Sequence, residues 1–276
     1  MPLAPHVLNS TQVNNPVLIF RFRFFPILAC VLAATVLHAE TPASVPPLRA
    51  PQSGFSFPAK QTLNYAVDWR VFPAGVVAFH QEADGDLERI SVTADTVGAV
   101  NLLFRVTDRF QSSFHRSTGC SQSFAKQLVE GRRRVNSTMK FDYAQNRAVV
   151  SEKNLVSKID KQKEVPIPSC VTDSLSAIFY AASQPLTVGD TFQFPLADAT
   201  RTVAVTMKVE GRDEIKTPAG TFQTIRVEPT AAAGVVKNRG NIWIWYTDDN
   251  RHIPVQMRAR LFWGTITFKL TSIEAK

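Results

Sequence analysis

From residue 61 onward the chain alternates apolar and polar side chains, and this period of two constrains the fold more than any other sequence feature. Alternation of this kind gives each face of an extended segment its own character, which is typical of a half-buried β-strand. The clearest example, at residues 62–70, carries the apolar residues Leu63, Tyr65, Val67 and Trp69. Similar segments recur at residues 76–83, 90–95, 106–114, 135–143, 190–196, 202–210, 222–228, 241–247, 253–262 and 266–270.

Short turn sequences separate these segments. We expect Pro73-Ala74-Gly75 to join residues 62–70 to residues 76–83 as a hairpin. Only one segment has helical spacing: Thr172 or Asp173 can cap it, and the helix should end before Pro185. Its apolar residues are Leu175, Ile178, Phe179 and Ala182. The strands do not alternate with long helices, which argues against a parallel α/β fold.

Ten or more antiparallel strands joined by short turns must curl, split into a sandwich or close on themselves. We therefore predict an all-β fold with one short helix, built as a large curved antiparallel sheet that is half-open or closed like a barrel. The helix would cover one face of the sheet or plug one end. The predicted organisation is a signal peptide at residues 1–39, a proline-rich spacer at residues 40–60 and a single β-rich domain at residues 61–276.

The N-terminal segment has the character of an export signal. Residues 1–39 contain no acidic residue, and Arg21 and Arg23 precede an apolar run of about fourteen residues, which is short for a membrane span. We expect cleavage after Ala39, which places the protein in the periplasm. Two alternatives remain open: an uncleaved N-terminal anchor, and a lipoprotein modified at Cys30. The spacer that follows holds five prolines, which favour extended backbone.

Composition narrows the chemistry. The 276 residues include 27 aromatic ones, which excludes disorder over the whole chain, and three cysteines, which excludes a four-cysteine zinc site. Signal removal takes away two arginines and no acidic residue, so the formal net charge falls from +8 to +6. The two remaining cysteines, Cys120 and Cys170, would lie in an oxidising compartment, and we expect them to form a disulfide. Two buried free thiols are the alternative.

No catalytic or cofactor motif stands out, so we expect a protein that is not an enzyme and that carries no cofactor and no metal. His80, His115 and His252 are scattered over different segments, and we expect them at the surface or at strand edges. Two acidic pairs, Asp84/Asp86 and Asp248/Asp249, lie in turns, where aspartate is common because it hydrogen-bonds the backbone.

Two features suggest binding. The segment Ile242–Tyr246 is apolar on both faces, and one face could line a groove for a lipid-like ligand; the candidate residues are Trp243, Trp245 and Trp263. A strand buried between the core and the helix explains the same pattern. The run Arg132-Arg133-Arg134 could contact an anionic surface, or could be a solvated strand end. Nucleic acid is a poor partner for an exported chain without an RNA-binding motif.

A set of short motifs resembles one known family. In chain order they are Tyr65-Ala66-Val67-Asp68-Trp69, Pro73-Ala74-Gly75, Phe141-Asp142, Asp173-Ser174-Leu175-Ser176, Phe179-Tyr180, Thr217-Pro218-Ala219-Gly220-Thr221-Phe222, Ile242-Trp243-Ile244-Trp245-Tyr246-Thr247-Asp248 and Ile253-Pro254. Over Leu63 to Leu270 the chain resembles the bacterial exported proteins grouped as domain-of-unknown-function family 3108. The resemblance implies an envelope-associated, β-rich protein with no assigned reaction, so no catalytic residue carries over. The cysteine pair is not part of that pattern.

Three functions fit these observations. The first is a non-enzymatic periplasmic protein that binds an amphipathic component of the cell envelope, such as a lipid, or an envelope-assembly partner. The second is a scaffold that docks other envelope proteins through a sheet edge or an apolar patch. The third is an envelope hydrolase whose site is assembled from distant residues, including His115 or His252.

Overall fold

A computed structural model describes residues 46–238 and 240–275 of the chain. The predicted signal peptide, Cys30 and the first part of the spacer lie outside the described residues. All the described strands and both hydrophobic cores belong to one compact unit, Ala43–Lys276.

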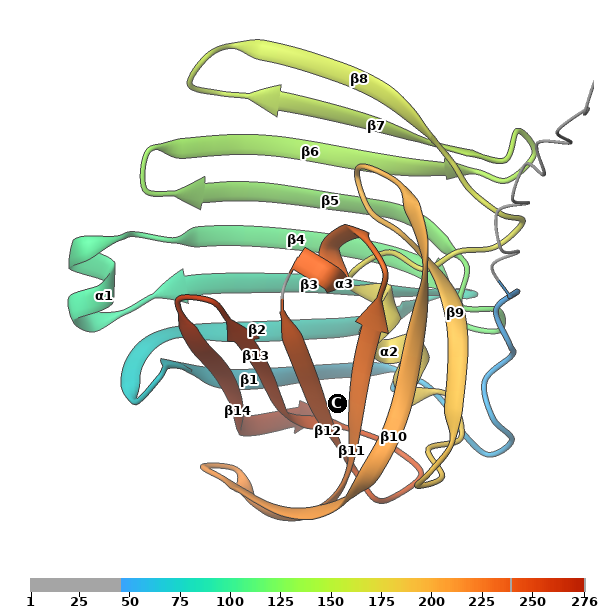
Figure 1. The fold of residues 1–276 in the computed structure, drawn as a ribbon, viewed down its shortest axis with the longest axis vertical. Coiled ribbons are helices and arrows are strands. Elements are labelled where there is room, and N and C mark those ends of the chain that lie inside the picture. The colour runs from blue at the N-terminus through green and yellow to red at the C-terminus, as the bar shows by residue number, and fades with distance from the viewer. Residues whose placement is uncertain (1–45, 239, 276) are drawn as a thin grey trace, which may run out of the picture. The chain divides into compact units, whose positions relative to one another are not determined.

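The described residues form fourteen β-strands and three short helices (Figure 1). The strands are β1 (Lys60–Trp69), β2 (Phe72–Asp84), β3 (Leu87–Thr96), β4 (Thr107–His115), β5 (Ser121–Glu130), β6 (Arg133–Asp142), β7 (Arg147–Asn154), β8 (Ile159–Pro166), β9 (Thr191–Ala197), β10 (Thr202–Thr217), β11 (Gly220–Ala231), β12 (Asn241–Thr247), β13 (Pro254–Leu261) and β14 (Gly264–Ala275). The helices are α1 (Gly98–Leu103), α2 (Ser176–Ala182) and α3 (Gly234–Asn238).

All fourteen strands belong to one antiparallel sheet, in the order β8-β7-β6-β5-β4-β3-β2-β1-β14-β13-β12-β11-β10-β9. The first and last strands of the chain pair in the middle of the sheet, where Leu63 faces Ile273 and Val67 faces Phe268. The sheet curls so strongly that β10–β12 run across the direction of β1–β4, with α2 between the two halves (Figure 1). This architecture confirms the predicted curved, barrel-like all-β fold.

The two edges of the sheet, β8 and β9, approach each other at one corner only. There the hydroxyl of Thr202 donates a hydrogen bond to the carbonyl oxygen of Pro166 at 2.8 Å, and Thr172 forms a parallel bridge with Leu196. A small hydrophobic core packs at this corner. Its buried residues are Met139, Phe141, Ala148, Val150, Val165, Ile167, Val171 and Ala197. Toward its other end β8 diverges from β9, and its residues are exposed on both faces (Figure 1).

The larger core lies on the concave face of the sheet. Its fully buried large side chains include Tyr65, Phe114, Tyr180, Phe194 and Tyr246. Burial of an aromatic side chain of this kind contributes about 1.5–3 kcal/mol. The three tyrosines therefore need internal partners for their hydroxyl groups, since a buried polar group without a hydrogen bond is costly.

The structure corrects the first predicted hairpin. Its turn lies at Arg70 and Val71, while Pro73-Ala74-Gly75 already belongs to β2. Arg70 adopts a left-handed conformation with φ of 57°, which closes the turn without glycine, and a register shift at Val67/Asp68 accommodates the proline. Proline is tolerated there because it lies at the start of a strand.

Three strands and two helices do not follow from the sequence pattern. β5, β7 and β8 escape the period-two rule because polar residues occupy both of their faces for part of their length. Part of the predicted spacer also packs against the sheet: Phe57 is buried in the larger core, and the amide of Gln52 donates to the carbonyl of Ser183. The folded unit therefore begins before the predicted boundary at residue 61.

Candidate functional site

An apolar cavity of about 420 Å³ lies between the concave face of the sheet and α2. Of the 23 residues that line it, only Ser174 and Arg258 are polar, and the guanidinium of Arg258 lies over the ring of Trp245. Cavities that bind small molecules commonly measure about 300–1,000 Å³ and are lined mainly by hydrophobic groups with a few polar ones. An apolar space of this size does not favour water, because water there finds few hydrogen-bonding partners.

Both halves of the sheet contribute to the lining. Phe79 on β2 and Phe124 on β5 come from one half, while Val205 on β10, Ile244 on β12 and Phe268 on β14 come from the other. Each is an inward-facing residue of an alternating strand, so the period of two places the lining directly. Sheet curvature then brings strands that are far apart in the sequence around one space.

The cavity is not enclosed: its partly exposed lining residues lie on β4, β5 and α2 as well as on β12–β14, and we call the part beside β12–β14 the mouth. Phe194 and Leu196 are buried, whereas the lining residues Phe124, Ile178, Ile242, Leu261 and Ile266 are partly exposed. Leu261 and Ile266 flank the turn between β13 and β14. A ligand could therefore enter beside this turn without unfolding the sheet.

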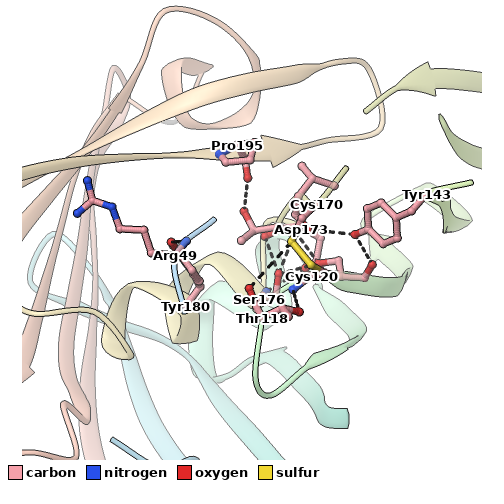
Figure 2. The surroundings of a disulfide bond; sticks show 12 residues. Arg49, Thr118, Cys120, Tyr143, Cys170, Asp173, Ser176, Tyr180 and Pro195 are labelled. Carbon is pink, nitrogen blue, oxygen red and sulfur yellow. Dashed lines mark hydrogen bonds between the residues drawn. A yellow bond between two sulfur atoms is a disulfide. The ribbon is translucent and has the colours of Figure 1, made fainter. Parts of the chain in front are cut away.

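Asp173 fixes the N-terminal end of α2, which forms the floor (Figure 2). Its carboxylate is buried and accepts four hydrogen bonds: Oδ2 accepts from the hydroxyls of Ser112 and Ser121, both at 2.7 Å, and Oδ1 accepts from the amides of Leu175 and Ser176. These two amides belong to the helix start, where backbone donors have no partner within the helix. The sequence motif Asp173-Ser174-Leu175-Ser176 is therefore a structural cap, and the predicted helix is confirmed.

Three further contacts hold α2 against the sheet and the preceding chain. The hydroxyl of Tyr246 donates to the carbonyl oxygen of Ile178 at 2.7 Å, and Nδ1 of His252 lies 2.7 Å from the carbonyl oxygen of Ala182. On the other side, the hydroxyl of Tyr180 accepts a hydrogen bond from the amide of Arg49 (Figure 2). The floor of the cavity is thus fixed at its start, middle and end.

The disulfide expected between Cys120 and Cys170 is present, with a Cα–Cα distance of 5.1 Å. It links the turn after β4 to the segment that leads into α2 (Figure 2). The neighbouring residue Ser121 belongs to the Asp173 network, and its amide donates to the carbonyl of Val171. The disulfide therefore stabilises the same segment that positions the cavity floor.

The tryptophans assigned to an apolar groove do not line the cavity. On β12, Ile242 and Ile244 point into it, and the alternation of the strand places Trp243 and Trp245 on the opposite face. There the indole N–H of Trp245 donates to Asp213 at 2.7 Å, and Arg258 lies over its ring at 5.3 Å. Trp263 lies in the turn between β13 and β14, with its ring 6.3 Å from that of Trp69. The predicted groove residues therefore lie outside this cavity, which is on the other face of β12.

The histidines are dispersed, and one differs from expectation. His80 is exposed and contacts the hydroxyl of Thr62, and His115 is partly buried at the end of β4. His252 was expected at the surface but is buried, because α2 packs over it. Among the described residues no group of three or more histidine, cysteine or acidic side chains is arranged to hold a metal ion.

One buried acidic group lies beside the packed spacer. Glu88 on β3 is fully buried, and its closest charged partner is Arg116 at 3.5 Å. Burial raises the pKa of its carboxyl group to about 7, and the positive charge of Arg116 offsets this only in part. The sequence contains no signal for this residue, because Glu88 follows a turn and looks like any exposed strand end.

The run Arg132-Arg133-Arg134 lies at the turn between β5 and β6, and all three side chains are exposed. Arg133 pairs with Glu130 at 2.5 Å. Within the described residues Arg132 and Arg134 form no ion pair. The turn therefore presents positive charge to solvent.

The family model for proteins of unknown function named DUF3108 matches residues 64–271. The chain belongs to this family, as its motifs indicated. No curated protein matches the chain.

Three solved structures match the chain at low similarity. A beta-barrel-like DUF1849 protein from Brucella abortus is 12% identical, covers 79% of this chain and 98% of its own, and gives a TM-score of 0.49. A protein from Bacteroides fragilis that is described as exported and as having a YmcC-like fold is 8% identical. It covers 80% of this chain and 99% of its own, with a TM-score of 0.37. A protein from Parabacteroides distasonis that is described as a lipoprotein is 9% identical. It covers 80% of this chain and 98% of its own, with a TM-score of 0.35.

Within residues 46–238 and 240–275, no helix combines the length and the apolar character needed to cross a bilayer.

Proposed function

We propose that this protein is an exported, non-enzymatic binding protein of the bacterial periplasm that holds an amphipathic lipid or a similar envelope component. The observation that carries the proposal is the cavity of about 420 Å³, whose 23 lining residues include only two polar ones. A lipid acyl chain is the class of ligand that this lining suits, because its transfer from water into an apolar site is favourable by about 0.8 kcal/mol for each methylene group.

The polar part of the ligand would remain near the mouth. Ser174 contributes a hydroxyl at the floor, while the partly exposed lining residues Ile242, Leu261 and Ile266 lie where the cavity reaches solvent. An amphipathic molecule can therefore bury its chain and keep its headgroup hydrated. The predicted export signal and the oxidised cysteine pair both support a location outside the cytoplasm.

The test is the displacement of a fluorescent fatty acid from the purified segment Ala43–Lys276. We expect saturable binding by the wild type and at least a tenfold loss in Ala259→Trp, because Ala259 lines the cavity near its mouth and the indole would occupy it. The matched control is Ala125→Trp. Ala125 is also partly buried on a strand, but it lies on the convex face, next to the lining residue Phe124.

Absence of binding by the wild type, or equal loss in both variants, would contradict the proposal. Native mass spectrometry of protein purified without detergent supplies an independent check, in which retained lipid is expected.

The other two functions have less support. A scaffold could pair through either edge strand, β8 or β9. The exposed part of β8 carries Asp160, Lys161, Lys163 and Glu164, and charged residues discourage edge pairing there. A hydrolase would need a base near a nucleophile, whereas Nδ1 of His252 is directed at a backbone carbonyl and the serines around Asp173 serve as its hydrogen-bond donors.

A further inference from the structure

Nine large apolar side chains are exposed along one margin of the sheet, and we call this set the apolar rim. Its members are Trp69, Val71, Phe72, Val76, Leu102, Leu103, Phe104, Phe262 and Trp263. They lie on the β1–β2 turn and the start of β2, on α1 and the residue after it, and on the β13–β14 turn. Figure 1 shows these turns and α1 along the left side of the sheet.

Direct contacts connect the parts of the apolar rim. The rings of Trp69 and Trp263 lie 6.3 Å apart, and the guanidinium of Arg70 donates to the carbonyl oxygen of Trp263 at 3.2 Å. α1 adjoins β2 through the hydrogen bond from the amide of Val97 to the carbonyl of Ala74. These contacts make the rim one surface that includes two turns and a helix.

The exposure of the apolar rim is extreme at its tips. Phe262 is 100% exposed, Leu102 is 88% exposed and Leu103 is 84% exposed. No residue of α1 is buried and only Val100 is partly buried, so packing gives this six-residue helix little support. Scattered single apolar residues on a surface are ordinary, but a connected set of this kind marks an interaction surface.

Basic residues accompany the apolar rim. Arg70 lies within it, Arg105 follows Phe104, and the β5–β6 turn that carries Arg132 and Arg134 adjoins it, because the amide of Gly131 donates to the carbonyl of Arg105. Nearby acidic groups are already paired: Asp68 with Lys269, Asp95 with Arg109 and Glu130 with Arg133. The margin therefore presents apolar tips flanked by unneutralised positive charge.

We propose that the apolar rim and its arginines dock the protein on the surface of an anionic lipid bilayer. Aromatic and aliphatic tips can enter the boundary between headgroups and acyl chains, where tryptophan is favoured, while arginines contact lipid phosphates. A second copy of this chain is a poorer occupant, because it would bring a like-charged margin against this one. The charge and the apolar tips together thus select a membrane.

The apolar rim lies next to the mouth of the cavity. Leu261 and Ile266, which lie at the cavity mouth, are the strand residues on either side of the rim turn that holds Phe262 and Trp263. Docking therefore places the mouth of the cavity against the bilayer. The docking itself does not depend on the proposed cavity ligand, and the two are measured separately.

The experiment is co-sedimentation of the segment Ala43–Lys276 with vesicles of phosphatidylglycerol and phosphatidylcholine, and with vesicles of phosphatidylcholine alone. This segment holds the complete sheet. We expect binding to the anionic vesicles that weakens in pure phosphatidylcholine and at high salt. The variant Phe262→Ser/Leu102→Ser should bind at least about tenfold more weakly, and Arg105→Gln/Arg132→Gln about 25-fold more weakly, given a factor of about five per arginine.

Two matched controls should bind as the wild type does. Val188→Ser removes an exposed apolar side chain from the loop before β9, and Arg201→Gln/Lys216→Gln removes two exposed charges outside the rim. All four variants change exposed residues, so unaltered thermal unfolding is expected in each. Blue-shifted tryptophan fluorescence on binding is expected from Trp263.

Undetectable vesicle binding, or rim variants that bind as the wild type does, would overturn the docking proposal. A dimer that the rim variants convert to a monomer, without vesicle binding, would assign the surface to self-association and overturn it equally. The fatty-acid assay separates the two proposals: rim variants should keep ligand binding, and Ala259→Trp should keep vesicle binding.

Discussion

The hydroxyl of Ser121 donates a hydrogen bond of 2.7 Å to Oδ2 of Asp173, and its oxygen accepts one of 2.9 Å from the amide of the same residue. This reciprocal pair joins the start of β5 to the start of α2, and Ser121 follows the disulfide residue Cys120 directly. The floor of the apolar cavity therefore depends on a polar cluster that lies behind it. A cluster of this kind stabilises only while every member is satisfied.

Asp173→Asn should lower the free energy of unfolding by about 2–4 kcal/mol. The asparagine amide would replace one acceptor oxygen with a donor, and that donor would face either two serine hydroxyls or two backbone amides. Urea unfolding measures the change. Asp160→Asn on the exposed part of β8 is the control and should stay within about 0.5 kcal/mol of the wild type. Equal stability of the two variants would refute the role of the cluster.

Replacement of both cysteines, Cys120→Ser/Cys170→Ser, should destabilise the fold by about 4 kcal/mol. The disulfide closes a loop across a sequence separation of 50 residues, and its loss increases the entropy of the unfolded chain. Dithiothreitol should move the urea midpoint of the wild type to that of the double variant and leave the variant unchanged. A wild-type midpoint that does not respond to reductant would show that the disulfide contributes nothing.

Glu88 should make the stability depend on pH between about 4.5 and 7. Its pKa is about 7 in the folded protein against an ordinary value of 4.5, because burial disfavours the ionised carboxylate, with Arg116 acting in the opposite direction. The folded state therefore keeps a proton that the unfolded state releases in this window, so stability falls as pH rises and is level above 7. The full effect is about 3 kcal/mol.

Urea unfolding at a series of pH values tests this dependence. In Glu88→Gln the fall in stability across the window should disappear, whereas Glu82→Gln, at an exposed residue paired with Lys60, should retain it. An unchanged slope in Glu88→Gln would assign the pH dependence to another group.

All four tyrosines should resist ionisation in the folded protein. Burial raises the pKa values of Tyr65, Tyr143, Tyr180 and Tyr246 above the ordinary value of 10.0. The stability that they contribute is complete below pH 10 and is lost as pH rises above it, since only the unfolded chain ionises easily there. Absorbance near 295 nm, where tyrosinate absorbs, measures the ionisation. At about pH 10.5 it should show little tyrosinate until the protein unfolds. A reversible titration centred near pH 10 without unfolding would contradict the burial of these hydroxyls.

Much of the fold follows from the sequence because a period of two records which face of a strand meets the core. Val203, Val205, Met207 and Val209 on β10 are buried as that pattern requires. The pattern fails for β8, because a strand exposed on both faces has no apolar face to record. It fails also for α1, none of whose apolar residues is fully buried.

The candidate site was predictable only in part. The alternation in Ile242–Tyr246 shows that both faces of the strand are apolar, but it does not say which face meets open space. The curl of the sheet decides that Ile242 and Ile244 line the cavity, while Trp245 packs with Arg258 and Asp213 outside it. The buried Glu88 is likewise invisible locally, because its burial comes from Arg116 and from the packed segment before β1.

The sequence by itself determined an antiparallel β-rich unit of the DUF3108 family, the helix that Asp173 caps and a disulfide. The strands follow from local periodicity, the helix from its capping residue and the disulfide from the number of cysteines. Only the tertiary structure decided that the sheet curls around an apolar cavity, and that the turns carrying Phe262 and Leu102 form one exposed rim. The physical reason is that curvature and the pairing of β1 with β14 bring together residues about 200 positions apart, and no local pattern encodes such a distance.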